Sequence, residues 1–137
     1  MIDQPPDFPP APHIPTPPQG RQLKILSTEG TSLSARHSLY TLGGYHTVDV
    51  LDPNPLCQCR FSSLRRKFTR CPHYAKDPDG FLKFLANVLK RDKYDVVMPT
   101  HEQVILLSKF REQVGRLAGI ALPDYAAMEL MQNKARF

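Results

Sequence analysis

Two short polar segments carry residues that could bind a small molecule. The first, Glu29-Gly30-Thr31-Ser32, directly follows an apolar run that begins at Leu23. It offers hydroxyl and backbone N–H groups, which bind anions when they lie at the start of a helix. It has one glycine and is not a GxGxxG dinucleotide motif, and the carboxylate of Glu29 would repel a phosphate. A substrate contact here competes with the simpler role of helix capping by Thr31 or Ser32.

The second polar segment, Thr100-His101-Glu102, lies between an expected strand and an expected helix. Thr100 suits a helix cap, and Glu102 in the first turn would complement the helix dipole. The same position would face the edge of a parallel sheet at which ligands bind. We therefore take Thr100, His101 and Glu102 as candidate substrate contacts, with plain capping as the alternative.

Four residues of the types that bind zinc fall within seventeen positions: Cys57, Cys59, Cys71 and His73. Structural zinc sites usually separate paired cysteines by two to four residues, because one intervening residue strains both ligands. No secretory signal precedes these cysteines, so disulfides are not expected either. We expect reduced thiols without a metal, and keep a zinc-stabilised interaction module as an alternative.

Basic residues gather in the middle of the chain, whose net charge is +5. The stretch 60–76 holds six of them and no acid: Arg60, Arg65, Arg66, Lys67, Arg70 and Lys76. A solvated loop and a site for an anionic ligand both fit this pattern. No helix-turn-helix, zinc-finger or RNA-binding signature is present, so a nucleic-acid partner is not expected. The sequence contains no nucleophile elbow or Walker loop either, and we assign no catalytic residue.

Alternating strands and helices are predicted to position these segments. Strands are expected at 23–28, 46–52, 94–98 and, briefly, 120–122; helices at 33–42, from Pro78 onward, at 101–117 and from Pro123 onward. Gly43-Gly44 ends the first helix, and Pro78 suits a first helical turn. The segment 56–76 is predicted to be the least regular. This alternation predicts an α/β fold: a three-layer, Rossmann-like parallel sheet of about four strands with helices on both faces.

Two of the expected helices have a clear apolar face. The predicted buried residues of the helix from Pro78 are Phe81, Leu82, Leu85, Val88 and Leu89, and those of the helix at 101–117 are Val104, Leu107, Phe110, Val114 and Leu117. Their spacing of three and four positions is that of a helix packed on one side.

Proline divides the chain into a leader and a folded part. Eight of the 14 prolines lie between Pro5 and Pro18, and proline at this density favours extended, solvated backbone. We expect residues 1–22 to form a disordered leader and the 115 residues after it to build one core. No apolar run approaches the length needed to span a bilayer, so neither a membrane protein nor a membrane partner is expected, and the expected location is cytoplasmic.

Five segments occur in a recognisable order: LKILSTEGTSLSARHSLYTLGG, HTVDVLDPNP, RFSSLRRKFTRCP, YDVVMPTHEQV and GIALPDYAAMELMQNKARF. Together they resemble the N-terminal part of ATP-grasp enzymes of the carbamoyl-phosphate-synthase-like and carboxylate–amine ligase type. The resemblance implies a Rossmann-like pre-ATP-grasp domain at 23–123 and, at 124–137, a terminal helix leading toward an ATP-grasp domain.

The resemblance implies an ATP-dependent ligase that joins a carboxylate to an amine through an acyl phosphate, with ATP and Mg²⁺ as cofactors of the complete enzyme. It implies that the loops at 29–32 and 100–102 edge the substrate pocket, and that Lys134 reaches the nucleotide. Asn133 stands where the family has an acid, and an exposed lysine is an equally good explanation of Lys134. The substrate is expected to be a small carboxylate or amine.

The glycine-rich lid and the acidic metal ligands of the family have no counterpart in these 137 residues. We therefore expect a domain that needs an ATP-grasp domain or chain as partner and is inactive alone. An exposed apolar surface near 125–137 would be the contact. The alternative is a free-standing Rossmann-like domain that binds an anionic small molecule through its basic segment.

Overall fold

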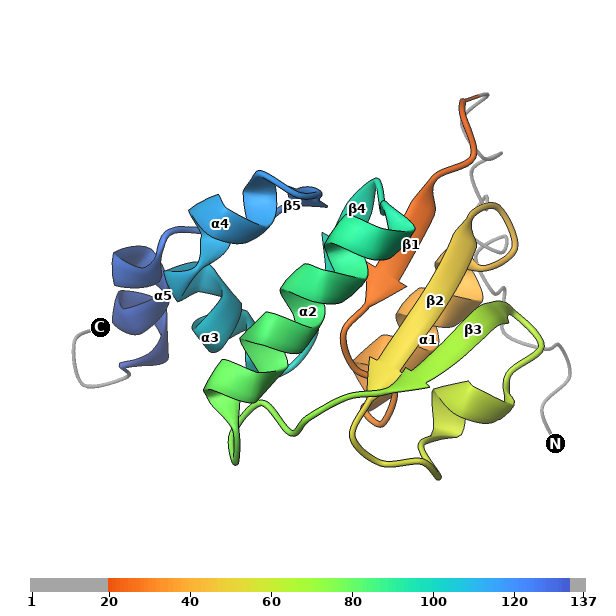
Figure 1. Cartoon of the computed structure of the whole chain (residues 1–137), viewed down its shortest axis with the longest axis horizontal. Helices are drawn as coiled ribbons and strands as arrows, with labels where there is room; N and C mark the ends of the chain where they lie inside the picture. The colour runs from red at the N-terminus through yellow and green to blue at the C-terminus, as the bar shows by residue number, and fades with distance from the viewer. Residues whose placement is uncertain (1–19, 134–137) are drawn as a thin grey trace, which may run out of the picture.

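A parallel sheet of five strands forms the centre of the molecule, seen in a computed structural model that describes residues 20–133 (Figure 1). The strands are β1 (Lys24–Ser27), β2 (Thr47–Asp52), β3 (Arg65–Arg70), β4 (Val96–Met98) and β5 (Gly119–Ile120). Their spatial order is β3-β2-β1-β4-β5, and every neighbouring pair is parallel. The chain thus builds one half of the sheet outward from β1 and then crosses to β4, which makes the β1–β4 boundary the switch point of the topology.

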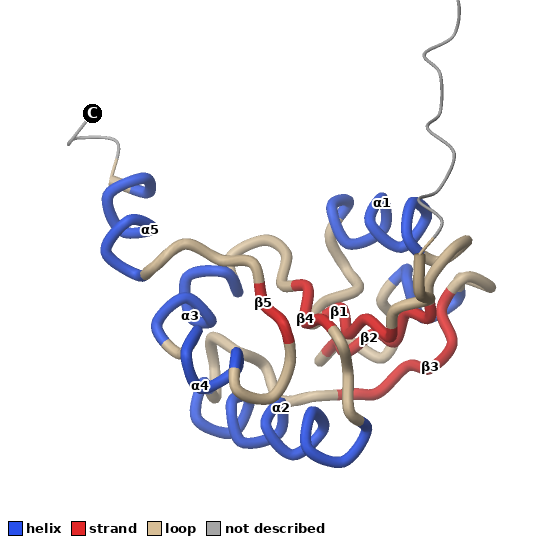
Figure 2. Tube along the Cα trace, turned by 90° about the horizontal axis from the view of Figure 1, so that it is seen from above, coloured by secondary structure: helices blue, strands red, loops and turns tan. Residues whose placement is uncertain are grey.

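Helices cover both faces of this sheet. They are α1 (Leu33–Leu42), the short 3₁₀ helix η1 (Gln58–Phe61), α2 (Pro78–Asp92), α3 (Gln103–Lys109), α4 (Arg111–Gly115) and α5 (Tyr125–Gln132). Figure 2 shows α1 on one side of the strands and α2 on the other. The three-layer, Rossmann-like α/β arrangement predicted from the sequence is confirmed, with five strands in place of about four.

The helix α1 begins and ends where its sequence predicts. The Ser32 side chain accepts a hydrogen bond from the backbone N–H of Ala35 at 3.1 Å, which caps the first turn. Gly43 ends the helix by donating its N–H to Leu39 O. Ala35 and Leu39 are the buried residues of α1, so this helix covers its face of the sheet with a narrow apolar stripe.

The core has one part on each side of the sheet. On the α1 side, Ile25, Val48 and Val50 of the strands pack with α1 and η1. On the other side, α2 buries Phe81, Leu85, Val88 and Leu89 as predicted, and Leu82 is partly buried. Because the central strands are covered on both faces, they carry nearly continuous apolar runs.

A buried carboxylate of β2 joins that strand to the edge strand β3 and to the segment before β4. Asp49 of β2, 2% exposed, accepts hydrogen bonds from the Arg66 guanidinium of β3 and from Tyr94 Oη at 2.6 Å. Burial alone would raise the pKa of Asp49, but the bonds from Arg66 and Tyr94 outweigh it and leave that pKa below its usual value.

The strand β3 corrects the prediction that 56–76 is irregular. The strand pairs with β2 at the edge of the sheet, and its six residues RRKFTR are half-buried or exposed. An edge strand needs no apolar run. Its place in the sheet is fixed by backbone pairing with β2 and, here, by the Arg66–Asp49 ion pair. Composition alone therefore hides this strand.

The single helix predicted at 101–117 is wrong as well: two short helices, α3 and α4, meet at Phe110. Near the break the Ser108 hydroxyl donates to Ile105 O at 2.8 Å, so it competes with the backbone ladder. The helix starts at Gln103 because His101 adopts a left-handed backbone, with φ of 59°. Leu107 and Val114 are buried as expected, whereas Val104, Phe110 and Leu117 are only partly buried.

The other predicted bounds shift by a few residues. The third predicted strand begins at Val96 rather than Tyr94, the fourth occupies 119–120, and the last helix begins at Tyr125 behind the cap of Asp124. Within residues 20–133, no helix combines the length and the apolar character that crossing a membrane requires. Residues 1–19 of the expected leader, and Lys134, lie outside the described residues.

Candidate functional site

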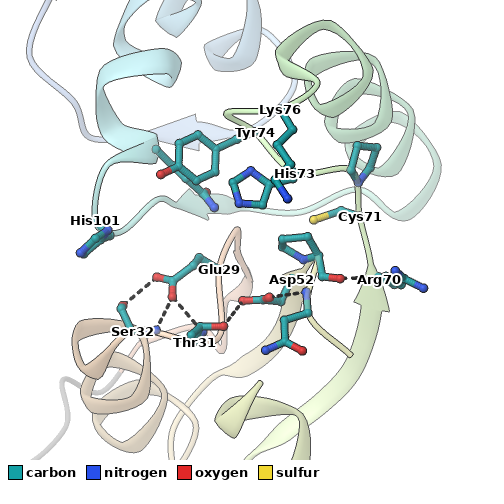
Figure 3. A pocket seen from close by; sticks show the side chains of 14 residues that line it. Glu29, Thr31, Ser32, Asp52, Arg70, Cys71, His73, Tyr74, Lys76 and His101 are labelled. Carbon is teal, nitrogen blue, oxygen red and sulfur yellow. Dashed lines mark hydrogen bonds between the residues drawn. The ribbon is translucent and has the colours of Figure 1, made fainter. Parts of the chain in front are cut away.

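A cavity of about 740 Å³ opens at the carboxyl ends of β1 to β4 (Figure 3). The loop after β1 contributes Glu29, Thr31 and Ser32; the end of β2 and its loop contribute Asp52, Pro53 and Asn54; the end of β3 and its loop contribute Arg70, Cys71, Pro72, His73, Tyr74 and Lys76; the segment after β4 contributes His101 and Gln103. This edge, next to the switch point, is where sheets of this type bind ligands.

Glu29 holds the loop after β1 in place. Its Oε1 accepts hydrogen bonds from the backbone N–H of Thr31 at 2.8 Å and from that of Ser32; its Oε2 accepts from Ser32 Oγ and Thr100 Oγ1, both at 2.7 Å. Burial by itself would raise the pKa of Glu29. The hydrogen bonds from Ser32 and Thr100 lower it by more than burial raises it, so the pKa lies below its usual value. Because its two oxygens already accept four hydrogen bonds, Glu29 has no acceptor left for a ligand and contributes only its negative charge to the cavity.

Asp52, at the end of β2, is the second buried carboxylate of the cavity. Its Oδ2 accepts from the Gly30 N–H at 2.8 Å and from Thr31 Oγ1 at 3.0 Å, and its Oδ1 accepts from the Asn54 N–H at 2.7 Å. A Cβ on Gly30 would lie 2.7 Å from Val50 Cγ1, so only glycine lets this loop approach β2 so closely.

The predicted site residues separate into two groups. Glu29, Thr31, Ser32 and His101 line the cavity. Gly30 and Thr100 hold the loops behind it through their bonds to Asp52 and Glu29. Glu102 lies in a neighbouring hollow, where it accepts a hydrogen bond from Tyr74 Oη at 3.0 Å. The structure thus brings the two predicted loops together, and contact of these residues with a substrate stays a prediction.

Cationic and imidazole groups come from the loop after β3. The Arg70 Nε donates to Pro53 O at 3.2 Å, and the side-chain ammonium of Lys76 has no hydrogen bond or ion pair with any residue in 20–133. His73 Nδ1 accepts from the Ala75 N–H at 3.1 Å, which places the proton of the neutral ring on Nε2. The His73 ring stacks on Tyr74 with 5.2 Å between centroids. These groups supply donors that the protein itself leaves open.

Gln103 carries an unused acceptor at the cavity. The residue is 1% exposed, and its Nε2 donates to Thr28 O at 3.0 Å. Its Oε1, like the hydroxyl of Thr28, finds no hydrogen-bond partner among residues 20–133. Buried polar atoms nearly always have a partner, so Gln103 Oε1 and the Thr28 hydroxyl are exceptions within the described part of the chain.

Sequence reasoning did not assign four of the lining residues to the site: Asp52, Asn54, Tyr74 and Gln103. It noted Arg70 and Lys76 only within the basic stretch 60–76, and His73 only among the possible zinc ligands. Asp52 ends a predicted strand, so its place at the carboxyl edge was available as a signal. For Arg70 and Lys76 the signal was the basic stretch itself, which fitted an anionic-ligand site, but the edge strand that brings them to the cavity was not recognised.

The three cysteines are buried thiols. Cys57, Cys59 and Cys71 form no disulfide. Burial raises all three pKa values, that of Cys59 to about 11 and that of Cys71 to about 12. Within 20–133 no group of three or more His, Cys, Asp or Glu side chains is placed to hold a metal ion, so the zinc alternative lacks a ligand set.

The fold has a counterpart among solved structures. The crystal structure of N5-carboxyaminoimidazole synthetase from Staphylococcus aureus complexed with ADP aligns with a TM-score of 0.56 and 22% sequence identity. The alignment covers 83% of this chain and 28% of that chain, so this chain spans little more than a quarter of the synthetase's length. Neither the comparison with protein-family models nor the search of curated proteins gave a match. What is shown is a shared α/β, Rossmann-like fold with part of that enzyme.

Proposed function

We propose that this chain is the N-terminal, substrate-side domain of an ATP-dependent ligase of the ATP-grasp type, which joins a carboxylate to an amine. In such a ligase the carboxylate attacks the γ-phosphorus of ATP, releasing ADP, and the amine then displaces phosphate from the acyl phosphate. A cytoplasmic location is part of the same proposal.

The observation that carries the proposal is the match of most of this chain to only 28% of a synthetase crystallised with ADP. The motif order that resembles the ATP-grasp family gives the same assignment independently. The described part of this chain holds no acidic cluster for a metal ion, so it does not fit Mg²⁺ by itself. Mg²⁺ and the phosphates of ATP are therefore assigned to an ATP-grasp domain, in the same polypeptide or in a partner.

The surface of α5 agrees with such a neighbour. Leu130 and Met131, consecutive residues of the last helix, are 49% and 62% exposed. An exposed apolar surface was expected near this end if another domain packs there, and these two exposed side chains support that expectation.

In this proposal the cavity residues bind and orient one substrate. The hydrogen bonds that Glu29 and Asp52 accept fix the two loops before any ligand arrives, so little ordering is needed on binding. Lys76 and His73 line the cavity and offer donors to an anionic group. The chain's own contribution to the reaction is therefore positioning.

The test is ADP formation by the complete polypeptide that the gene encodes, with Lys76→Ala as variant and Lys83→Ala, an exposed lysine on α2, as matched control. We expect ADP formation to require both a carboxylate and an amine, and Lys76→Ala to raise the KM for one of them about tenfold with an unchanged KM for ATP. A raised KM for ATP, or equal effects of both variants, contradicts the proposal.

A second function is favoured by one observation: residues 29–103 build the cavity without help from another domain. A free-standing domain that binds an anionic small molecule would show ligand binding and no ATP-dependent reaction. The same assay separates the two functions.

A further inference from the structure

A second hollow lies on the face of the sheet that α1 covers, away from α2 (Figure 2). Its volume is about 670 Å³, and it shares no lining residue with the cavity at the carboxyl ends of the strands. The helix α1, the helix η1 and the turn before β3 form it, and its lining includes Arg36, Tyr40, Gln58, Phe61, Ser63 and Leu64. This hollow is called the aromatic groove below.

Two exposed aromatic side chains line the aromatic groove. Tyr40 of α1 is 60% exposed, and Phe61 of η1 is 68% exposed. The Arg36 guanidinium lies 5.8 Å from the centroid of the Tyr40 ring, and that of Arg60 lies 5.7 Å from the centroid of the Phe61 ring. Large apolar side chains exposed around one hollow indicate a surface that another segment covers.

The polar groups of the aromatic groove offer hydrogen-bond donors. Among residues 20–133, no hydrogen bond involves the Tyr40 hydroxyl, the Gln58 amide group or the Ser63 hydroxyl, and the Arg36 guanidinium has neither a hydrogen bond nor an ion pair. The segment that suits this surface presents apolar groups together with hydrogen-bond acceptors.

The chain itself contains a segment of this chemistry. Eight prolines lie between Pro5 and Pro18. Because proline has no backbone N–H, such a segment presents apolar rings and carbonyl acceptors, and polyproline II segments bind aromatic-lined grooves at a low cost in entropy. We infer that residues 5–18 bind in the aromatic groove of the same molecule. Composition alone predicted a disordered leader, and a complementary groove changes that expectation.

Charge favours this occupant. Residues 1–19 contain the acids Asp3 and Asp7 and no lysine or arginine, whereas the whole chain has a net charge of +5. The Arg36 guanidinium at the groove has no carboxylate partner among the described residues, so it is open to a carboxylate of the leader.

The point at which the chain enters the fold favours it as well. Leu23 packs against the same part of the core as Leu64, which lines the aromatic groove. Residues 5–18 in the polyproline II conformation would span about 40 Å, enough to reach the groove from this point. The binding involves neither a nucleotide nor the cavity, so its test is independent of the proposed function.

The experiment places a nitroxide spin label on the leader of the full 137-residue chain. Ala11→Cys supplies the attachment site, since the three native cysteines are buried thiols of raised pKa that react slowly. In ¹⁵N NMR spectra the label broadens the amide signals of nearby residues. We expect the signals of 36–40 and 58–64 to lose intensity relative to the same chain with a diamagnetic label, and those of α5 to keep theirs.

Two further variants of the spin-labelled chain test the contacts. Phe61→Ser, at an exposed side chain, should remove most of the broadening. The matched control is Tyr45→Ser, which should leave the broadening unchanged: Tyr45 is 49% exposed and does not line the groove, although it precedes His46, which accepts a hydrogen bond from the Leu23 N–H.

A change within the leader tests the role of proline. Serine in place of Pro9, Pro10, Pro12 and Pro15 keeps the length and charge of the leader but not its preference for polyproline II, so the broadening at the groove should largely disappear. The amide spectrum of the remaining chain shows that each variant is folded.

Four results would overturn the inference: no broadening at the aromatic groove, broadening centred on other residues, equal effects of Phe61→Ser and Tyr45→Ser, or unchanged broadening in the serine-substituted leader. A mixture of spin-labelled ¹⁴N chain and unlabelled ¹⁵N chain should show no broadening. Broadening as strong in the mixture as in the labelled ¹⁵N chain would assign the groove to the leader of a second copy and overturn binding within one molecule.

Discussion

Thr100 Oγ1 donates a hydrogen bond to Glu29 Oε2 at 2.7 Å, and this bond joins the loops that follow β1 and β4. The two strands are neighbours at the switch point of the sheet, so the bond fixes two loops beside the cavity relative to each other. Two residues that the sequence offered as substrate contacts thus hold each other. The structure gives them a part in shaping the site, and their contact with a substrate stays a prediction.

The Glu29 carboxylate should stabilise the fold measurably. Glu29→Gln replaces one acceptor oxygen by an amide that cannot accept from Ser32 or Thr100, so we expect a loss of about 1–3 kcal/mol in the free energy of unfolding. Urea denaturation at pH 7 measures it, with the exposed Glu112→Gln as control. A loss no larger than that of the control would contradict the role given to Glu29.

The same carboxylate predicts a pH dependence. Hydrogen bonds hold the pKa of Glu29 below its ordinary value of 4.5, so the folded state binds this proton less readily than the unfolded state. Its stabilisation is complete above pH 4.5 and is lost as the pH falls through the lowered pKa. The wild-type free energy of unfolding should therefore fall more steeply below that pH than that of Glu29→Gln. Parallel curves would be evidence against the assignment.

Arg66 should matter because its partner is buried. Arg66→Gln leaves the Asp49 carboxylate, 3% exposed, with Tyr94 as its remaining side-chain partner, and we expect a cost of about 3 kcal/mol at pH 7. The lost cation also raises the pKa of Asp49, so the variant should recover part of its deficit as the pH is lowered and the carboxyl protonates. Chemical denaturation at pH 7 and pH 5 tests both points. A deficit that grows toward low pH is the contrary result.

Gly30 and Gly44 form a matched pair for testing the close approach of the loop after β1. A Cβ on Gly30 would lie 2.7 Å from Val50 Cγ1 and 3.0 Å from Cys57 Sγ, whereas one on Gly44 would meet nothing within 4 Å. Gly30→Ala should therefore lower the free energy of unfolding by about 1–3 kcal/mol, and Gly44→Ala should leave it nearly unchanged. Thermal melts of the two variants decide the matter, and similar melting temperatures would speak against the packing described.

The buried cysteines should react slowly. Burial raises the pKa of Cys59 to about 11 and that of Cys71 to about 12, so little thiolate is present at pH 8. We expect a disulfide reagent to label the three thiols only in denaturant, and a chelator to leave the melting temperature unchanged. Chelator-induced unfolding would restore the zinc alternative.

The success of sequence reasoning depended on how local its signals were. Helix α1 was predicted with its exact bounds because Ser32 and Gly43 act within one turn of the helix that they cap. Strand β3 was missed because its position depends on pairing with β2 and on Asp49, contacts that composition does not report. The break at Phe110 was missed because the apolar spacing continues across it.

The site shows the same division. The loops after β1 and β4 were located from the alternation of elements, since ligands gather at one edge of a parallel sheet. Asp52 and Gln103 were not assigned to the site. Lys76 and His73 were noted in the sequence, but their place at this edge was not predicted, because strand β3, which leads into their loop, was not recognised. The unpaired Oε1 of Gln103 can be recognised only from the structure, in which the Nε2 of the same amide donates to Thr28 O.

Calorimetry of ATP·Mg²⁺ binding tests the central claim most directly. The claim is that this chain supplies the substrate side of a ligase while another domain holds the nucleotide. We predict no measurable heat of binding for the 137-residue chain and binding by the complete polypeptide that includes an ATP-grasp domain. Tight binding of ATP·Mg²⁺ by the 137-residue chain alone would contradict the claim and identify a self-contained nucleotide-binding domain.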